Sequence, residues 1–528
     1  MITFEQDILA LLSEKLGKRI LQVQPLQLGK AYVRVNPEDH RDALKVLLDA
    51  DENAGLSALT GVDLGKSIEL MYHIRTHGTI ITIRTEVSKE NAKIKSVTDL
   101  VPGANFHERE LVDLFGVIVE GHPNPKRLVL PDNWPKKVFP LRKDAELSNI
   151  ANNSEDSVDL DEKQLTYCEV PVNIVVGPQH PALLEPEKFS LKVDGETVKE
   201  VEPRIGYVHR GIEKAAEQRT FLQDIYLVER ICGICNACHA TCFCQTVESI
   251  MGTSIPRRAQ YLRTIILELN RIQSHMLLLG HAGFEIGYET LFQYMWRDRE
   301  FAMDMMECLT GNRVIASFIT IGGVRRDLKE ELIPKMKGTL AILKERMSFY
   351  KHLFESDVTL KMRTQNVGVL NKKDAIKLCV VGPVARGSGV NMDVRKDEPY
   401  VAYGEMPFNI VMYNEGDAWA RLMVRLDEIN ESIKIIEYAL DNLPSGPYRV
   451  RVPRVVPSGE AISRVEAPRG ELFYYVKSNG SAYPERVKVR TPTFANILSF
   501  VHIAKGGNIA DVPASFVSLD PCFSCTDR

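Results

Sequence analysis

The sequence lacks any apolar run long enough to cross a membrane. Of its 528 residues 44% are hydrophobic, yet no stretch reaches the roughly 18 to 20 consecutive apolar residues that a membrane-spanning helix needs. No apolar segment of the signal-peptide type follows Met1. We therefore expect a soluble, cytoplasmic chain whose length exceeds what one hydrophobic core usually serves, and hence two domains.

A strong net charge is also lacking. The 66 basic residues nearly balance the 70 acidic ones, which gives a formal net charge of -4. Such a chain has no overall positive electrostatic potential that would favour binding to nucleic acid or to an anionic membrane surface. A nucleic-acid partner is therefore not expected.

Cysteines are unevenly placed along the chain. A framework of disulfides is not expected in a long chain without a secretory signal. Three of the ten cysteines stand alone and are typical of small buried hydrophobic residues: Cys168, Cys308 and Cys379. The other seven crowd into residues 232–244 or close the chain at Cys522 and Cys525.

The N-terminal part has the pattern of a small α/β domain. Residues 3–17 are amphipathic, and residues 68–87 form two alternating segments that break at His77-Gly78, as in a hairpin. Residues 145–164 are poor in large apolar side chains and rich in Asn, Ser, Asp and Glu. We therefore predict a domain over 1–145, an acidic and polar linker over 146–170, and a second domain over 171–528.

The second domain is predicted to be mainly helical, which makes the fold class α+β. Ser254 and Pro256 have the spacing of a helix cap and a first-turn proline, and apolar residues recur at helical spacing from Leu262 to Leu279. A second apolar seam runs from Leu422 to Leu440 and ends before Pro444. Such a seam packs on other helices.

Two CxxC pairs stand at opposite ends of the second domain. Cys232 and Cys235 lie in ERICGICNACHATCFC, and Cys522 and Cys525 lie in the terminal SLDPCFSCTDR. One such pair is a weak signal, but two favour a metal site of four thiolates, which suits zinc, iron–sulfur or nickel. A zinc ribbon normally gathers its ligands within a short loop, so the long separation weakens zinc without excluding it.

At these residues the sequence resembles a known family. Residues 230–239 fit the RxCGxCxxxH motif of [NiFe]-hydrogenase large subunits, with Arg230 at its start and His239 at its end, and DPCFSC fits their C-terminal DPCxxC motif. In that family a protease removes a tail during nickel insertion, so the resemblance implies that Arg528 is the processed end. A terminal segment that holds two metal ligands would be fixed in place by the metal, whereas chain ends are usually poorly ordered.

The resemblance extends over nearly the whole chain. FHERELVDLFG and the stretch after it look like the 30-kDa subunit of respiratory complex I. GPQHPALLEPEKFSLKVDGE, RIGYVHRGIEKA and VEAPRGELFYYV look like the complex I 49-kDa subunit and the energy-converting, group 4 hydrogenases. A fusion of these two modules is most similar to the large subunit of formate hydrogenlyase.

The resemblance implies a catalytic centre of nickel and iron, with CO and CN⁻ ligands on the iron. Cys232 and Cys522 would be terminal nickel ligands, while Cys235 and Cys525 would bridge nickel to iron. Such a centre splits H2 heterolytically or runs backwards to make it, and a terminal thiolate can take the proton.

Further residues around the centre follow from the same resemblance. Arg469 would stand over the open metal position, and Glu185 would exchange protons with Cys522. Pro492 and Thr493 match the position that hydrogen-bonds a cyanide, and His239 would orient the first cysteine loop. Leu183 and Leu184 are expected to desolvate Glu185 and raise its pKa. The alternative for each of these residues is an ordinary structural role, as a side chain that packs in the core or faces solvent.

Glu213 sits where some relatives bind Mg²⁺ near the C-terminus, although those relatives supply a terminal histidine where this chain has Arg528. Cys238, Cys242 and Cys244 fall outside the metal pattern and are expected to pack in the core. Two alternatives remain open. One is a fused subunit of a complex I-like quinone oxidoreductase, although complex I replaces all four cysteines and has a quinone-contacting histidine where this chain carries Leu184. The other is a scaffold with a four-cysteine zinc site.

Partner subunits are implied because the sequence has no further set of four clustered cysteines that could bind an iron–sulfur cluster and carry electrons away from the centre. We expect a small hydrogenase subunit that holds a [4Fe-4S] cluster, ferredoxin-like electron-transfer subunits and integral membrane subunits. A maturation protease and nickel-insertion proteins would act during assembly. The protein would then be peripheral on the cytoplasmic side of the cell membrane.

Overall fold

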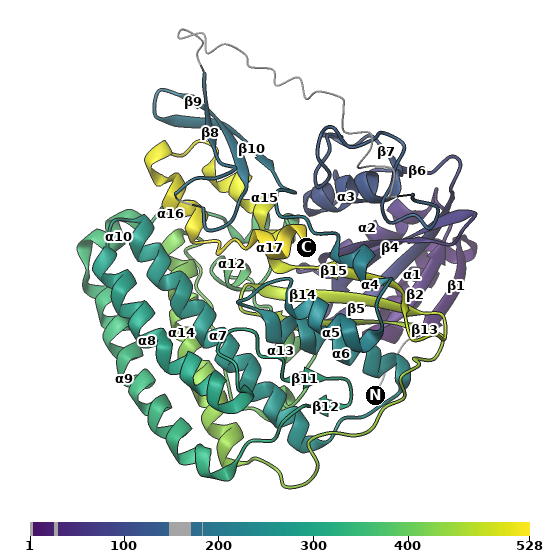
Figure 1. Ribbon diagram of the computed structural model, residues 1–528. Helices are drawn as coiled ribbons and strands as arrows, with labels where there is room; N and C mark the ends of the chain where they lie inside the picture. Colours follow the sequence, from purple (N-terminus) through teal and green to yellow (C-terminus); the bar gives the residue numbers. More distant parts are fainter. Residues whose placement is uncertain (1–3, 26–29, 147–170, 182) are drawn as a thin grey trace. The chain divides into compact units, whose positions relative to one another are not determined.

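The computed structural model describes residues 4–25, 30–146, 171–181 and 183–528, and its helices and strands confirm the α+β fold class (Figure 1). The chain divides into two compact units. The first comprises residues 1–210, 376–379 and Asp527, and the second comprises 211–375, 380–526 and Arg528. The predicted linker lies almost wholly outside the described residues, so the domain boundaries drawn from the sequence stay a prediction.

A five-stranded sheet in the order β1-β2-β5-β4-β3 forms the core of the first unit. All its neighbouring strands are antiparallel except β2 and β5, which run parallel. Its strands are β1 (Ile20–Pro25), β2 (Ala31–Val35), β3 (Gly55–Asp63), β4 (Ser67–Thr76) and β5 (Thr79–Ser88).

The hairpin expected at His77-Gly78 is confirmed. Thr76 pairs with Thr79, and the two residues between them have φ of 45° and 77°. Positive φ at both central positions gives the turn that matches the twist of two antiparallel strands, and glycine adopts it without strain. The alternating residues Ile68, Leu70, Tyr72 and Ile74 are all buried, as a core-facing strand requires.

Three helices accompany this sheet, and the first confirms the amphipathic segment predicted near the N-terminus. They are α1 (Phe4–Leu16), α2 (His40–Ala50) and α3 (Asn105–Phe115). Helix α3 approaches β3 so closely that a Cβ on Gly61 would lie 2.9 Å from the ring of Phe115. Glycine is therefore required at this position for the helix to reach the sheet.

Two smaller β structures complete the first unit. One pairs β6 (Lys93–Lys95) with β7 (Ile118–Glu120). The other is a three-stranded antiparallel sheet of β8 (Val172–Val176), β9 (Lys188–Asp194) and β10 (Thr197–Arg204). The loop between β8 and β9 carries GPQHPALLEPE, the segment in which the proton-exchanging glutamate is predicted.

Long helices that pack on one another dominate the second unit (Figure 1). They are α7 (Arg257–Glu285), α8 (Glu289–Thr310), α9 (Ile333–Ser356) and α14 (Ala418–Asp441). The apolar seam from Leu422 to Leu440 lies on α14, which packs on α7 and α9 as predicted. Helix α7 begins at Arg257, so Pro256 occupies the cap position and the expected capping by Ser254 is wrong.

The other helices of this unit are shorter. They are α4 (Ile212–Ala216), α5 (Phe221–Glu229), α6 (Asn236–Met251), α10 (Val358–Thr364), α11 (Lys372–Lys377), α12 (Pro383–Arg386), α13 (Val394–Asp397), α15 (Pro492–Ala504), α16 (Val512–Val517) and α17 (Phe523–Asp527). Two of them, α6 and α17, begin next to the cysteine pairs. Two short strands, β11 (Ile319–Thr320) and β12 (Gly323–Val324), form a small hairpin beside α6 and α7.

A buried antiparallel sheet lies against α6 and positions the turn that bears Arg469. Its strands are β13 (Gly459–Ala467), β14 (Gly470–Ser478) and β15 (Pro484–Arg490). Ala467 pairs with Gly470, so Pro468 and Arg469 form the turn between β13 and β14. Gly470 has φ of 126°, and a Cβ there would lie 2.7 Å from the backbone nitrogen of Gly382. Only glycine allows this approach, which fixes the turn.

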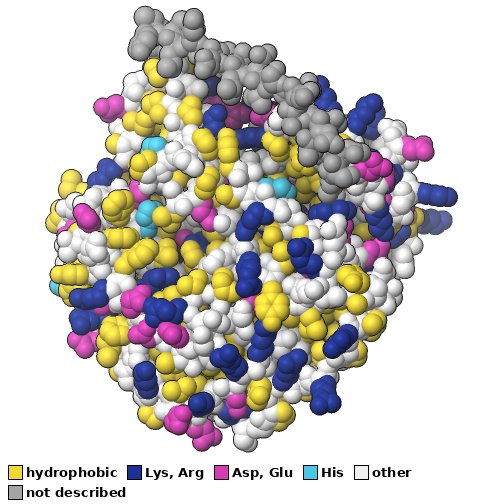
Figure 2. Space-filling model, viewed as in Figure 1, with side chains coloured by type: hydrophobic (Ala, Val, Ile, Leu, Met, Phe, Trp, Pro, Cys, Tyr) yellow, Lys and Arg dark blue, Asp and Glu magenta, His cyan; other side chains and the backbone are white. Residues whose placement is uncertain are grey.

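No helix within the described ranges is both long enough and apolar enough to span a membrane. On the face shown in Figure 2, basic and acidic side chains are interspersed among hydrophobic ones.

Candidate metal centre

The first cysteine pair is held by the start of a buried helix. Cys232 lies in the short loop after α5, and Cys235 is the residue that caps α6. The backbone N–H of Ile234 donates to Cys232 Sγ at 3.3 Å, and Asn270 on α7 donates to the Ile234 carbonyl at 2.6 Å. These bonds fix the loop so that both sulfur atoms face the same side.

The second pair is held in the same manner by the last helix. Cys522 caps α17, and Cys525 lies on its first turn. The side-chain hydroxyls of two threonines hold this segment: Cys522 N donates to Thr493 Oγ1 at 3.2 Å, and Thr491 Oγ1 donates to the Cys525 carbonyl at 2.9 Å. The C-terminal segment is therefore fixed by buried hydrogen bonds.

The two pairs face each other sulfur to sulfur. Cys232 Sγ lies 3.4 Å from Cys522 Sγ, and Cys235 Sγ lies 3.4 Å from Cys525 Sγ. All four side chains are buried, with at most 4% exposed. This is the pairing that the resemblance implies for the terminal and the bridging ligands.

The ligand atoms form two overlapping groups. Cys232, Cys522 and Cys525 make one group, and Cys235, His239 and Cys525 make the other, with the atoms of each group within 4.8 Å of one another. The two groups share the Cys525 sulfur, so both belong to one candidate metal site. Four buried thiols of this kind suit nickel, iron or zinc and do not suit hard cations.

The four thiols influence one another's protonation strongly. Hydrogen bonds from Cys235, then from Cys522 and Cys525, lower the pKa of Cys232. The pKa of Cys235 is raised by its hydrogen bond with Cys232 and by burial, and that of Cys525 is raised by its hydrogen bonds with the other three thiols and by burial. Without a metal the cluster therefore holds protons that a metal must displace. Metal binding here releases protons and is favoured by rising pH.

Arg469 is buried beside the C-terminal cysteine motif. Its Nη2 lies 2.7 Å from Asp520 Oδ1, and its Nε donates to the Asp520 carbonyl at 2.9 Å. Burial alone would lower the pKa of Arg469, but the negative charge of Asp520 and then those of Cys522 and Cys232 raise it well above its ordinary value. The arginine is thus held charged next to the thiols.

Pro492 and Thr493 form the first turn of α15, with Thr491 as its cap. Thr493 is buried, and its hydroxyl accepts from Cys522 N, which places both predicted residues beside the C-terminal pair. Thr491 had no role in the sequence-based prediction. Its place one residue before Pro492 in RTPTF was the signal that could have found it.

His239 lies on the first turn of α6 and faces the second pair. Its Nε2 is 3.6 Å from Cys525 Sγ, and its Nδ1 is 2.7 Å from the hydroxyl oxygen of Tyr474 on β14. The role expected of His239, to orient the first cysteine loop, stays a prediction, and the structure places its ring against the second pair. Tyr474 was missed, since nothing in FYYV distinguishes it from its neighbour Tyr475.

Glu213 on α4 is surrounded by cations. Arg486 Nη2 lies 2.7 Å from its Oε2, while Arg528 Nε and Lys488 Nζ lie 3.2 and 3.6 Å from its Oε1. Burial would raise the pKa of Glu213, but the charges of Lys488, Arg486 and Arg528 hold it well below its ordinary value. A Mg²⁺ ion here would compete with three positive side chains, so the magnesium site remains a prediction from the resemblance alone.

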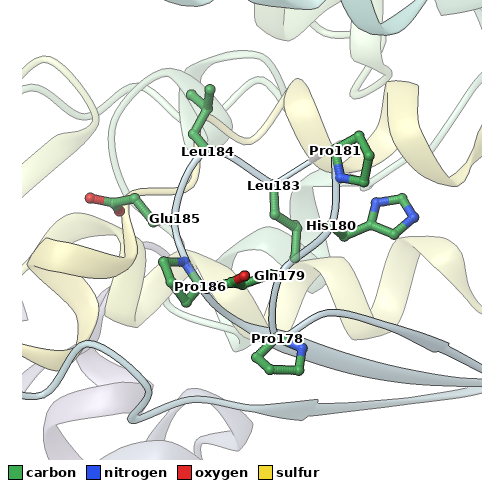
Figure 3. A pocket seen from close by; sticks show the side chains of 8 residues that line it. All are labelled: Pro178, Gln179, His180, Pro181, Leu183, Leu184, Glu185 and Pro186. Carbon is green, nitrogen blue, oxygen red and sulfur yellow. The ribbon is translucent and has the colours of Figure 1, made fainter.

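Glu185 lies on the loop between β8 and β9, among the residues that line a pocket of about 470 Å³. Figure 3 shows the Leu183 side chain pointing into the loop, while those of Leu184 and Glu185 point outward. Glu185 is half-buried and Leu184 is 60% exposed. The expected desolvation of Glu185 by these two leucines is therefore wrong for Leu184, whose side chain is too exposed to exclude water.

The fully desolvated carboxyl of this loop is Glu187, two residues further on. Its side chain is 0% exposed, and neither carboxyl oxygen has a hydrogen-bond partner among the described residues. Burial, and next the charge of Asp527, raises the pKa of Glu187 to about 10. Asp527 itself accepts from the backbone N–H groups of Gly206 and Val208 at 2.8 and 3.0 Å. No sequence pattern separates Glu187 from Glu185, and so the prediction missed it.

The remaining cysteines of the first cluster are packing residues, as expected. Cys238, Cys242 and Cys244 are all 0% exposed, and none belongs to either ligand group. Burial raises the pKa of Cys238 to about 12. Among the lone cysteines, Cys379 is buried, Cys308 is partly exposed, and Cys168 lies outside the described residues.

Three protein families match parts of the chain. The respiratory-chain NADH dehydrogenase 30-kDa subunit matches residues 33–150, its 49-kDa subunit matches residues 285–456 and 453–528, and the nickel-dependent hydrogenases match residues 210–281. The hydrogenase match covers Cys232, Cys235 and His239. The fold and the thiol site thus define a class: a fused large subunit of the complex I and hydrogenase type, within the oxidoreductases.

Individual relatives share this architecture. The fused C/D subunit of the NADH-quinone oxidoreductase of Phocaeicola vulgatus is 35% identical over 90% of this chain and 95% of its own length. Formate hydrogenlyase subunit 5 of Escherichia coli is 36% identical over 85% of this chain and 79% of its own length. The solved structure of an archaeal membrane-bound sulfane sulfur reductase contains a chain that is 36% identical, with a TM-score of 0.65 over 68% of this chain and 98% of that one.

The chain belongs to this family and is a group 4 hydrogenase-like large subunit with fused 30-kDa-like and 49-kDa-like modules.

Proposed function

We propose that this chain is the catalytic large subunit of a membrane-associated, H2-evolving [NiFe] hydrogenase that interconverts H2 with two protons and two electrons. The observation that carries the proposal is the cluster of four buried thiols, paired at 3.4 Å across two CxxC motifs that lie 290 residues apart. The architecture shared with complex I does not by itself require four thiols that face one another in a buried site.

The chain's own residues divide the work of holding the centre. Cys232 and Cys522 would serve as terminal ligands to nickel, and Cys235 and Cys525 as ligands common to nickel and iron. A nickel–iron centre bound there, with CO and CN⁻ on the iron, would supply the redox chemistry of H2. Thr493, beside Cys522, offers the hydroxyl that the resemblance assigns to a cyanide.

Arg469 would act by electrostatics. The guanidinium is held by Asp520 at two atoms, so its orientation is fixed, and burial excludes the water that would screen its charge. A fixed positive charge beside Cys522 and Cys232 stabilises negative charge that develops at the centre.

Proton transfer would begin at Cys522. A terminal thiolate can accept a proton, and Glu185, the residue that the resemblance assigns to proton exchange, would then carry it away as a general acid–base group. The outward orientation of the Glu185 side chain in Figure 3 suits a group that delivers protons to water.

One experiment tests the proposal. Protein purified under anaerobic conditions is analysed for metals and examined by infrared spectroscopy. We expect nickel and iron at about one each per chain, with the absorption bands of CO and CN⁻ bound to iron. Zinc alone, at about one per chain and without these bands, would reject the proposal and leave a four-cysteine zinc scaffold.

A second candidate is a fused subunit of a complex I-like quinone oxidoreductase. It is favoured by the similarity to the fused C/D subunit of the NADH-quinone oxidoreductase over 90% of this chain. The four facing thiols argue against it, as does Leu184 at the position where the resemblance places a quinone-contacting histidine. This candidate would be supported by a complex that reduces quinone, contains no nickel and neither produces nor consumes H2.

The proposal includes partners and a location. Electrons need a small subunit with a [4Fe-4S] cluster and ferredoxin-like subunits, because both groups of potential metal ligands found among the described residues belong to the one thiol cluster. Integral membrane subunits would hold the complex at the cytoplasmic side of the membrane. A maturation protease and nickel-insertion proteins would complete the centre. Purification with co-isolated subunits tests all of these.

A further inference from the structure

A buried hydrogen-bond chain leads from the second cysteine pair to a strand of the neighbouring sheet. Cys525 Sγ, His239 Nε2 and Nδ1, and the hydroxyl of Tyr474 follow one another, with separations of 3.6 Å and 2.7 Å. His239 is 1% exposed, and Cys525 and Tyr474 are each 1% exposed or less. The chain of bonds therefore lies where water does not compete for them.

Aromatic packing holds the tyrosine in place. The ring of Tyr474 meets those of His239 and Phe243 edge to face, with centroids 6.0 and 6.3 Å apart. Both partners come from α6, and Tyr474 comes from β14, which packs on that helix. Such contacts fix the direction in which the hydroxyl points.

The direction of each hydrogen bond follows from the chemistry of the groups. A metal-bound thiolate is an acceptor, so the hydrogen on the facing side must be on Nε2 of His239. In a neutral imidazole the other nitrogen, Nδ1, is then an acceptor. The Tyr474 hydroxyl is the group that can donate to it, and the 2.7 Å separation is that of a good hydrogen bond.

We propose that Tyr474 is a positioning residue of the metal centre: its hydroxyl holds His239 in the tautomer whose Nε2–H donates to Cys525 Sγ. This inference rests on the proposed function, in which Cys525 is a bridging ligand. A hydrogen bond to a metal-bound sulfur withdraws electron density from it and raises the reduction potential of the site.

The sequence supplies a matched control on the same strand. Tyr475 is the next residue of β14, is also 0% exposed, and donates its hydroxyl to Glu460 Oε2 at 2.7 Å. Successive side chains of a strand point to opposite faces, so Tyr475 points away from His239. Tyr474→Phe and Tyr475→Phe each remove one hydroxyl and one hydrogen bond from adjacent positions.

The experiment compares these two variants with the wild-type protein. We expect nickel and iron contents near wild type in both. The infrared bands of CO and CN⁻ should shift, and the midpoint potential of the centre should fall, in Tyr474→Phe only. H2 production should drop by about 10-fold in Tyr474→Phe, the scale of losing an outer partner of a metal ligand.

A double variant separates positioning from general damage. If Tyr474 acts through His239, then Tyr474→Phe added to His239→Ala should cause no further band shift, so the two effects should not add. Unchanged bands and potential in Tyr474→Phe would overturn the inference. Equal shifts in Tyr475→Phe would overturn it too, because they would show that loss of any buried hydroxyl of this strand disturbs the centre.

Failure of the proposed function gives a different result. In that case the wild-type protein itself shows no CO or CN⁻ bands. The same comparison is then made on protein loaded with Co²⁺, whose sulfur-to-metal absorption reports on the thiolates. A shift of this absorption in Tyr474→Phe and not in Tyr475→Phe supports the role of Tyr474, and its absence in both overturns it.

Discussion

Arg469 and Asp520 form a buried ion pair that joins the β13–β14 turn to the residues just before the C-terminal cysteines, with Nη2 and Oδ1 2.7 Å apart. Asp520 has φ of 56°, in the left-handed region that residues other than glycine adopt uncommonly, although aspartate adopts it more often than most. The same guanidinium also donates to the Asp520 carbonyl at 2.9 Å. The arginine thereby holds an uncommon backbone conformation two residues from Cys522.

The first prediction follows from this pair. Arg469→Lys keeps the charge, but a single ammonium cannot reproduce the planar contact with both the side chain and the backbone of Asp520. We expect metal contents near wild type and a loss of H2 production of about 10²-fold or more. Arg257→Lys, which alters only an exposed ion pair with Glu405, is the control and should be indistinguishable from wild type in an H2 assay.

The second prediction concerns the ligands. Cys525→Ser should lose the bimetallic site, because its sulfur belongs to both ligand groups and an alkoxide is a poorer ligand for soft metals. Cys238→Ser, whose thiol packs 3.9 Å from Asn270 Oδ1 outside the cluster, should keep its metals. Metal analysis of the two purified proteins decides between them. Equal nickel loss would mean that the first cysteine cluster has been assigned wrongly.

The third prediction concerns proton transfer. Glu185→Gln preserves the shape of the side chain but cannot ionise. Nickel and iron should stay near wild type, while H2 production and H/D exchange should fall by about 10²-fold, the range for losing a positioned acid–base group. Turnover of this variant at close to the normal rate would show that protons leave by another route.

The fourth prediction is a pH dependence of stability that arises from Glu187. Its pKa is raised to about 10, chiefly by burial, so the folded state holds a proton that the unfolded state releases above the ordinary pKa of glutamate. The wild-type protein therefore loses stability as pH rises from about 4.5 towards 10, by at most about 1.4 kcal/mol per pH unit. Glu187→Gln removes this loss.

Thermal unfolding at pH 5 and pH 9 tests it. The stability of Glu187→Gln minus that of the wild-type protein should be greater at pH 9 than at pH 5. Glu200→Gln changes an exposed carboxylate of the same small sheet, paired with Lys192, and should show no such trend. A pH-independent difference for Glu187→Gln would mean that Glu187 is ionised in the folded protein.

The fifth prediction concerns Glu213. Its low pKa means that it contributes stability above the ordinary pKa of glutamate, and this contribution is lost as pH falls towards its folded value. Glu213→Gln would leave Arg486, Lys488 and Arg528 without their shared anion, so at pH 7 we expect a loss of about 3 to 5 kcal/mol. Glu196→Gln, an exposed carboxylate at the turn of the small sheet, is the comparison.

Magnesium provides a direct check on the same residue. Because three cations surround Glu213, added Mg²⁺ should leave the thermal midpoint of the wild-type protein unchanged. A rise of the midpoint with Mg²⁺, absent in Glu213→Gln, would instead support the magnesium site that the resemblance implies.

Elements whose signals are local can be predicted from the sequence. The period of the apolar residues predicted α14, the alternation around His77-Gly78 predicted the β4–β5 hairpin, and the two CxxC pairs predicted a thiol site. Helical and strand patterns depend on near neighbours along the chain, which is why they can be read there. The start of α7 was misplaced because local signals did not separate Ser254 from Pro256 as its cap.

Contacts between residues far apart in the chain became known from the folded structure. Cys232 lies against Cys522, which is 290 residues away in the sequence. His239 contacts Tyr474, which is 235 residues away, and does not contact the adjacent Tyr475 in the same way. Glu185 and Glu187 stand two positions apart in one segment, yet one is half-buried with its side chain turned outward and the other is 0% exposed. Burial and neighbouring charges together set the pKa of a carboxyl group, and both are supplied by whatever packs against it from elsewhere in the chain.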